Sequence, residues 1–244
     1  MNSLFLQSLS IAWEQIPSTS YLWNIPALTM LRTMTFHKNI TFLCGENGTG
    51  KSTLLESIAV AYGYNAEGGT RNYRFSTFDD VSELQDAIRL VRGYRPRNSG
   101  YFFRAESFFN VATAATTRYS DFPGQRPDYH GMSHGESFLS FLQSESREGL
   151  YLMDEPEAAL SVQRQLVLIS HMHQMALEGS QFIVATHSPI LLGMPEAAIL
   201  SFEERGIHET TWEETESYLL TKLFLENRDR LLSKLYEPYE DIED

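Results

Sequence analysis

The chain alternates short, continuously apolar runs with segments whose apolar residues recur at helical spacing. The runs "ITFLC", "GYFF", "GLYLMDEP" and "QFIVATHSP" are typical of strands buried on both faces. The segments "STLLESIAVAYG" and "SVQRQLVLISHMHQMALEG" predict helices. Because buried strands that alternate with helices are typical of parallel sheets, the pattern predicts an α/β fold with a mostly parallel central sheet flanked by helices.

Three other stretches carry weaker patterns. Residues 4–42 mix β-like pieces with two prolines, which predicts a β region before the central sheet. The segment "DDVSELQDAIRLVRG" predicts a short amphipathic helix capped by Asp80 or Ser82. The segment "AAILSFEERGIHETTW" predicts a hairpin. Residues 213–235 predict an amphipathic helix that either packs on the domain or docks a partner.

Composition restricts the classes of function. A net charge of -13 argues against a surface that binds nucleic acid throughout, and any such contact has to be local. Cys44 is the only cysteine, which excludes an intrachain disulfide and fits a reducing cytoplasm. The N-terminus lacks the basic region of a signal peptide, and no apolar run is long enough for a transmembrane helix. We therefore expect a soluble, cytoplasmic protein.

The segment "GENGTGKST" is the strongest chemical signal. It follows an apolar strand and opens a helix, so its glycines allow backbone N–H groups to face phosphate oxygens at a helix N-terminus. Lys51 is expected to reach the β- and γ-phosphates of ATP, and Ser52 to ligate Mg²⁺. The predicted nucleotide-binding residues are Asn47, Gly48, Thr49, Gly50, Lys51, Ser52 and Thr53.

Two further strand ends carry candidate catalytic side chains. Asp154 and Glu155 follow the strand "LYLM", where Asp154 would hold Mg²⁺ and Glu155 would orient or deprotonate the attacking water. His187 follows the strand "QFIVA" and is placed to reach the γ-phosphate and Glu155. Taken singly, such acids are usually solvated strand ends and such a histidine is often a satisfied side chain. His171 and His173 are two residues apart and do not share a helix face, which disfavours a metal site there.

The order of the motifs resembles that of the ABC-type ATPases. A Walker A loop, a short signature "MSHGES" at a helix start, a Walker B strand followed by Glu and Pro, and a switch histidine follow one another. The resemblance implies that Ser133, Gly135 and Glu136 complete the ATP site of a second subunit, so that two copies sandwich two ATP molecules. Ser133 and Glu136 also fit a plain capping box, and both interpretations can hold.

Two family motifs match less well. No glutamine follows "GYFF", so Arg104 or Glu106 would replace the family's glutamine, with Glu106 as a further metal ligand. A structural salt bridge is the alternative interpretation. The segment "EAALS" resembles the D-loop, with Ser161 where many members have Asp.

The motifs resemble most the soluble branch related to RecF, SMC and overcoming-lysogenization-defect proteins, along nearly the whole chain. This resemblance implies one ATPase domain over residues 1–244, with a short helical lid at about residues 64–132. It also implies an ATP-dependent homodimer that acts on DNA or an effector protein in DNA repair or phage defence. A transporter subunit and a nucleotide-gated binding module are the alternatives. An Arg-rich, aromatic-interleaved stretch, Arg71–Arg104, is either a local DNA face or a solvated face with salt bridges.

Overall fold

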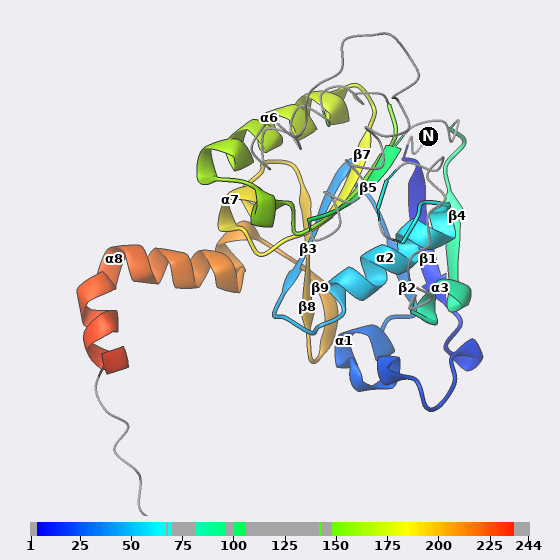
Figure 1. The fold of residues 1–244 in the computed structure, drawn as a ribbon, viewed down its shortest axis with the longest axis horizontal. Helices are drawn as coiled ribbons and strands as arrows, with labels where there is room; N and C mark the ends of the chain where they lie inside the picture. Colours follow the sequence, from blue (N-terminus) through cyan, green and yellow to red (C-terminus); the bar gives the residue numbers. More distant parts are fainter. Residues whose placement is uncertain are drawn as a thin grey trace, which may run out of the picture.

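A six-stranded sheet forms the centre of the molecule (Figure 1). The computed structural model describes residues 4–66, 68–69, 82–95, 100–105, 142 and 148–236. In spatial order the strands are β5 (Gly100–Arg104), β6 (Leu150–Asp154), β7 (Gln181–Ala185), β3 (Ile40–Gly45), β8 (Ala198–Glu203) and β9 (Gly206–Thr210). The first five are parallel and β9 is antiparallel to β8. The predicted α/β fold, its buried strands and the β8–β9 hairpin are confirmed.

A smaller antiparallel sheet stands beside the central one. Its order is β2 (Thr33–Thr35), β1 (Leu6–Ile11) and β4 (Ile88–Arg92). The predicted N-terminal β region is therefore present. The helix expected over "DDVSELQDAIRLVRG" is wrong at its C-terminal end, because α3 (Leu84–Ala87) ends where the chain enters β4 at Ile88. Ile88 is buried and Arg89 is exposed, which is the alternation of a strand. Backbone pairing with β1 stabilises this strand.

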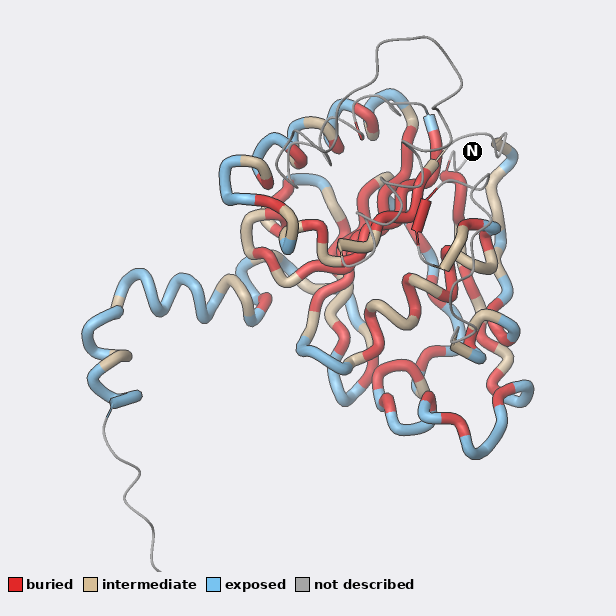
Figure 2. The backbone as a smooth tube through the Cα atoms, in the orientation of Figure 1, coloured by how far each residue is buried: buried red, intermediate tan, exposed pale blue. Residues whose placement is uncertain are grey.

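Helices cover both faces of the central sheet (Figures 1 and 2). On one face, α2 (Lys51–Tyr62) packs Leu54 and Ile58 into the same core as the small sheet. On the other face, α6 (Val162–Leu177) and α7 (Pro189–Leu192) form a second core around Leu168 and Met172. Neighbouring residues of β3 and β7 belong to opposite cores, because successive strand side chains point to opposite faces.

A buried glutamine joins the two sheets. The Gln181 side-chain amide donates to the Leu6 carbonyl at 2.9 Å, and its oxygen accepts from the Leu6 N–H at 2.8 Å. The Gln181 side chain therefore pairs with the backbone of β1 as a neighbouring strand would. These two bonds hold the N-terminal sheet against the start of β7. The short elements η1 (Trp13–Gln15), η2 (Tyr21–Asn24) and α1 (Pro26–Thr29) follow β1. Leu28 of α1 lies against Gly50 at the start of α2.

The C-terminal helix leaves the body of the molecule (Figure 1). After η5 (Trp212–Glu214), α8 (Glu216–Tyr236) runs for 21 residues, with non-helical backbone angles at Asn227, where it bends. The predicted helix is confirmed, but none of its residues is buried (Figure 2). In the part of the chain that the structure describes, no helix combines the length and apolarity needed to cross a membrane.

Candidate functional site

The Gly-rich loop connects β3 to α2 along a backbone path that only glycine fits. Gly50 has a φ of +91°, and a Cβ there would lie 2.6 Å from Leu28 Cδ1. Gly45 has a φ of +134°, and its Cβ would meet the Phe202 carbonyl oxygen at 2.4 Å. The N-cap residue of α2 is Gly50, which has no side chain to cap the first turn, so the N–H groups there can face an anion.

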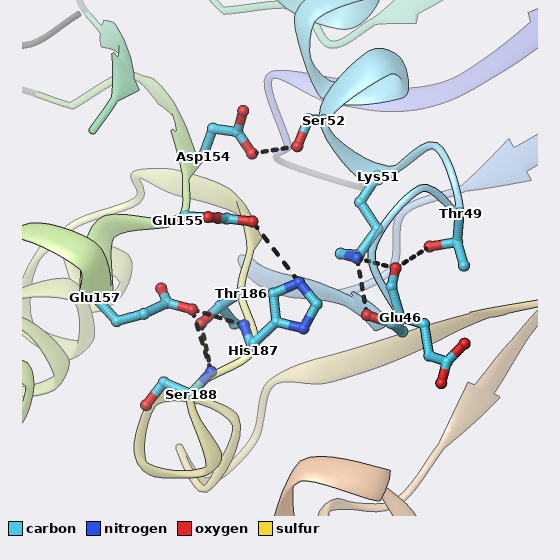
Figure 3. A network of polar contacts seen from close by, with 11 residues as sticks. Glu46, Thr49, Lys51, Ser52, Asp154, Glu155, Glu157, Thr186, His187 and Ser188 are labelled. Atoms are coloured by element: carbon cyan, nitrogen blue, oxygen red, sulfur yellow. Dashed lines mark hydrogen bonds and ion pairs between the residues drawn. The ribbon is translucent and has the colours of Figure 1, made fainter. Parts of the chain in front are cut away.

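Lys51 is folded over the loop (Figure 3). Its ammonium group donates hydrogen bonds to the carbonyl oxygens of Gly45 at 2.8 Å and Glu46 at 2.7 Å. The residue is only 5% exposed. Burial lowers the pKa of its ammonium, and the Glu155 carboxylate opposes that shift. The loop is also tied by the Thr49 hydroxyl, which donates to the Glu46 carbonyl at 2.8 Å.

A hydroxyl and a carboxylate meet where α2 approaches the end of β6. Ser52 Oγ donates to Asp154 Oδ1 at 2.8 Å, and Asp154 is 8% exposed. Such hard oxygen atoms are the ligands that Mg²⁺ prefers, and it usually takes only one or two from protein with the rest from phosphate and water. The pair therefore fits a magnesium ion that is shared with a phosphate ligand. Among the residues that the structure describes, no cluster of three or more His, Cys, Asp or Glu suggests an all-protein metal site.

Glu155 and His187 face each other across the ends of β6 and β7 (Figure 3). His187 Nε2 lies 3.7 Å from Glu155 Oε1. Glu155 has left-handed backbone angles, φ 49° and ψ 53°, and its N–H donates to the Ala185 carbonyl at 2.9 Å. Burial lowers the pKa of His187, and the Lys51 charge adds to this shift. The imidazole is therefore held neutral near pH 7.

Glu157, in η4 (Pro156–Ala159), connects the end of β6 to the loop that carries His187. Its Oε1 accepts hydrogen bonds from the backbone N–H groups of His187 at 2.6 Å and Ser188 at 3.2 Å. The Ser188 hydroxyl donates to the buried Gln165 Oε1 at 2.6 Å, which continues the network into α6. In the sequence, Glu157 stands out only as the first residue of the segment that resembles the D-loop. No spacing rule indicates that its carboxylate crosses to the end of the next strand.

An open pocket of about 410 Å³ extends from the loop toward the N-terminal region. Its lining combines the loop residues, the start of α2 and Glu155 with Tyr21, Asn24 and Ile25. Tyr21 is 52% exposed. The volume lies in the range of small-molecule sites. Sequence reasoning missed Tyr21, and an exposed aromatic residue between two prolines was the only available signal.

Three of the four described arginines of the basic stretch contact the protein itself, whereas Arg89 is exposed. Arg104 forms a salt bridge to Glu56 at 2.7 Å, and its Nε lies 3.9 Å from Asp154 Oδ2. Arg92 stacks over Tyr62 and donates to the Ala61 carbonyl at 2.6 Å. Arg95 pairs with Glu148 and donates to the Gly179 carbonyl at 3.1 Å. Arg92, Arg95 and Arg104 are therefore engaged in salt bridges and in hydrogen bonds to carbonyl groups of the protein, and they do not form an open basic face.

Several predicted site residues lie outside the described residues. These are Glu106, Ser133, Gly135 and Glu136, together with Arg71, Arg74 and Arg97 of the basic stretch. Their expected roles stay predictions. Within the described residues the structure does bring together the loop around Lys51, the acids after β6 and the histidine after β7.

Comparison with known proteins agrees with a P-loop assignment for part of the chain. Residues 31–110, about a third of the sequence, match the family described as "AAA domain", which covers β3, the Gly-rich loop and α2. No curated protein matches the chain.

Similar solved structures include cbiO1 from Clostridium perfringens, part of the ABC transporter complex cbiONQ. It is 14% identical over 83% of this chain and 91% of its own, with a TM-score of 0.48. MJ1267, an ATP-binding cassette of an ABC transporter, in its ADP conformation is 14% identical over 96% and 99%, with a TM-score of 0.45. A twinned structure of the same cassette is 14% identical over 94% of this chain and 98% of its own, with a TM-score of 0.49. At this identity the likeness assigns neither a substrate nor a partner to the chain.

Proposed function

We propose that the protein is a Mg²⁺-dependent ATPase. The observation that carries this proposal is the meeting of three strand ends at one edge of the parallel sheet. The Gly-rich loop follows β3, Asp154 and Glu155 follow β6, and His187 follows β7. Ligands of open α/β sheets bind outside the carboxyl ends of the strands, which is this edge.

The loop and Lys51 bind the phosphates of ATP in this proposal. The N–H groups at the start of α2 supply donors, and the Lys51 ammonium exchanges its carbonyl partners for phosphate oxygens. Ser52 and Asp154 would hold Mg²⁺ through their side-chain oxygens, and the ion would supply positive charge against the phosphates.

Glu155 is the residue that orients or deprotonates the attacking water. Its carboxylate is partly exposed at the edge of the pocket, so that a water molecule can reach it. The neutral His187 imidazole beside it can hydrogen-bond a γ-phosphate oxygen or that water. The left-handed backbone of Glu155 turns the chain sharply after β6, and strain of this kind is common at functional sites.

Tyr21 and Asn24 would contact the base of the nucleotide. They line the same pocket as the phosphate-binding loop, and the exposed ring of Tyr21 offers a flat apolar face. Aromatic faces stack on nucleobases, and the Asn24 amide can donate to and accept from a base edge.

The sandwich dimer and the DNA-repair or phage-defence role follow from the motif resemblance and belong to this proposal. Ser133, Gly135 and Glu136 would complete the partner's site, and hydrolysis would open the dimer. The contacts of Arg92 and Arg95 within the protein favour an effector protein over DNA as the object of this cycle.

The test measures nucleotide binding and Mg²⁺-dependent ATP turnover on the full chain. Wild type should hydrolyse ATP, Lys51→Ala should lose nucleotide binding, and Glu155→Gln should bind ATP with turnover reduced on the order of a hundredfold or more. Lys38→Ala, which removes an exposed lysine outside the pocket, is the matched control and should behave as wild type. Equal nucleotide affinity in Lys51→Ala and wild type would refute the site.

A further inference from the structure

The helix α8 exposes an unusual amount of apolar surface. None of its 21 residues is buried. Its seven exposed large apolar side chains are Leu219, Leu220, Leu223, Phe224, Leu225, Leu235 and Tyr236. An isolated amphipathic helix gains most of its stability from packing its apolar face. A helix of this length and composition therefore needs a surface to cover it.

The two halves of α8 repeat one pattern. "LLTKLF" occupies residues 219–224 and "LLSKLY" occupies residues 231–236, on either side of the bend at Asn227. Successive helical residues turn by about 100°, so the first, second, fifth and sixth residues of each repeat form one apolar face. Each half of the helix therefore presents an equivalent apolar face, with Leu225 on the side opposite to it.

The contact that anchors α8 uses the other side of the helix. Tyr218 packs on Trp212 with ring centroids 4.5 Å apart, and the Lys222 ammonium lies 5.5 Å from the Tyr218 ring centre. By the same 100° rotation, Tyr218 and Lys222 lie away from the face of Leu219, Leu220 and Leu223. Among the residues that the structure describes, the anchor thus holds the helix while leaving its apolar face uncovered.

The charges of the segment are divided between its halves. Within α8, residues 216–226 carry two carboxylates and one lysine, whereas residues 227–236 carry three cations and one carboxylate. Two copies that pair in an antiparallel orientation place the acidic half of each against the basic half of the other. Parallel pairing would bring like charges together.

We infer that α8 pairs with α8 of a second copy of this chain, antiparallel, with each apolar repeat packed against the other repeat of the partner. The repeat makes this pairing self-complementary, as a two-fold interface requires. The acidic half of the segment and the net charge of -13 disfavour an anionic membrane as the occupant.

This dimer needs no nucleotide, so the inference goes beyond the ATPase proposal and does not depend on it. If both hold, the helix pair keeps two ATP sites at high local concentration. Closure of the sandwich then becomes an intramolecular step.

The first test is the solution mass of the full chain without nucleotide, measured by light scattering over a concentration series. Wild type should be a dimer, and Leu220→Glu combined with Phe224→Glu should be a monomer. Leu225→Glu is the control, because Leu225 is 74% exposed but faces the other way, and it should remain a dimer. Far-UV circular dichroism identifies any variant that has lost its fold. A monomeric wild type, or a folded double variant that still dimerises, would overturn the inference.

The second test measures orientation. A spin label at Lys234→Cys reports the distance between the two copies, since the native Cys44 is buried and burial raises its pKa. An antiparallel pair places the labels on the order of 20 Å apart along the axis, whereas a parallel pair brings them to about 10 Å. The short distance would refute the antiparallel arrangement. Flotation of monomeric wild type with phosphatidylserine vesicles, lost in the double variant, would assign the face to a membrane instead.

Discussion

The Glu157 carboxylate accepts a hydrogen bond from the backbone N–H of His187 at 2.6 Å, so one acidic side chain after β6 holds the loop that follows β7. The same oxygen accepts from Ser188 N–H at 3.2 Å. The other carboxylate oxygen is buried and has no hydrogen-bond partner among the described residues. Glu157 therefore places the backbone of the histidine relative to Glu155.

Replacing Glu157 by Ala should remove the hydrogen bonds that join the segment after β6 to the loop after β7. Loss of a charged acceptor of two N–H groups is expected to lower the free energy of unfolding by about 1–3 kcal/mol. Turnover should fall by roughly tenfold or more, because the histidine is no longer held in position. Urea unfolding and steady-state ATP hydrolysis measure the two effects. Glu157→Gln keeps an acceptor oxygen and should recover part of both, so equal losses in the two variants would contradict the hydrogen-bond role.

Replacing Tyr21 by Ala should weaken nucleotide binding. Stacking of an aromatic ring on a base contributes on the order of 1–3 kcal/mol, which corresponds to roughly a tenfold rise in Kd or more. Tyr21→Phe keeps the ring and should bind as wild type does. Titration with a fluorescent ATP analogue checks both, with Tyr94→Ala as the control, because this tyrosine is fully exposed and does not line the pocket. An unchanged Kd in Tyr21→Ala would place the base elsewhere.

Replacing Glu155 by Gln should trap a closed sandwich with ATP. Since α8 is inferred to dimerise the chain without nucleotide, the measurement is made in the Leu220→Glu, Phe224→Glu double variant. This variant is expected to be a monomer before ATP is added. Light scattering should then show a dimer only when Mg-ATP is present. A monomer that binds ATP tightly yet never dimerises would count against the sandwich while leaving the nucleotide site intact.

The stability of the wild type should fall on acidification partly because of His187. The pKa of this side chain is lowered from its ordinary value of 6.5 by burial, so the unfolded chain binds its proton more readily than the folded chain does. The associated stability is present above about pH 6.5 and is lost as the pH falls below it. In urea unfolding at pH 7.5 and pH 5.5, wild type should lose more stability than His187→Gln. Parallel losses in the two proteins would show that His187 titrates normally.

Local patterns were sufficient for much of the molecule. The apolar runs predicted four of the buried strands, and the 3.6-residue spacing predicted α2, α6 and α8, because both signals reside in neighbouring residues. Glycines before Lys51 predicted a phosphate-binding loop for the same reason. The helix expected through Ile88 was wrong because residues 88–92 form a strand by pairing with β1. No local sequence pattern indicates that partner.

What the sequence determined by itself was the α/β class and the identity of the residues at the strand ends, since these follow from periodicity and from residue chemistry. Only the tertiary structure showed that Ser52 meets Asp154, that Tyr21 lines the same pocket as the Gly-rich loop and that Glu157 holds the backbone of His187. Each of these relationships joins residues far apart in the chain, and their distance is set by the packing of β3, β6, β7 and the N-terminal region against one another. Packing of this kind depends on the whole core at once, which no single segment encodes.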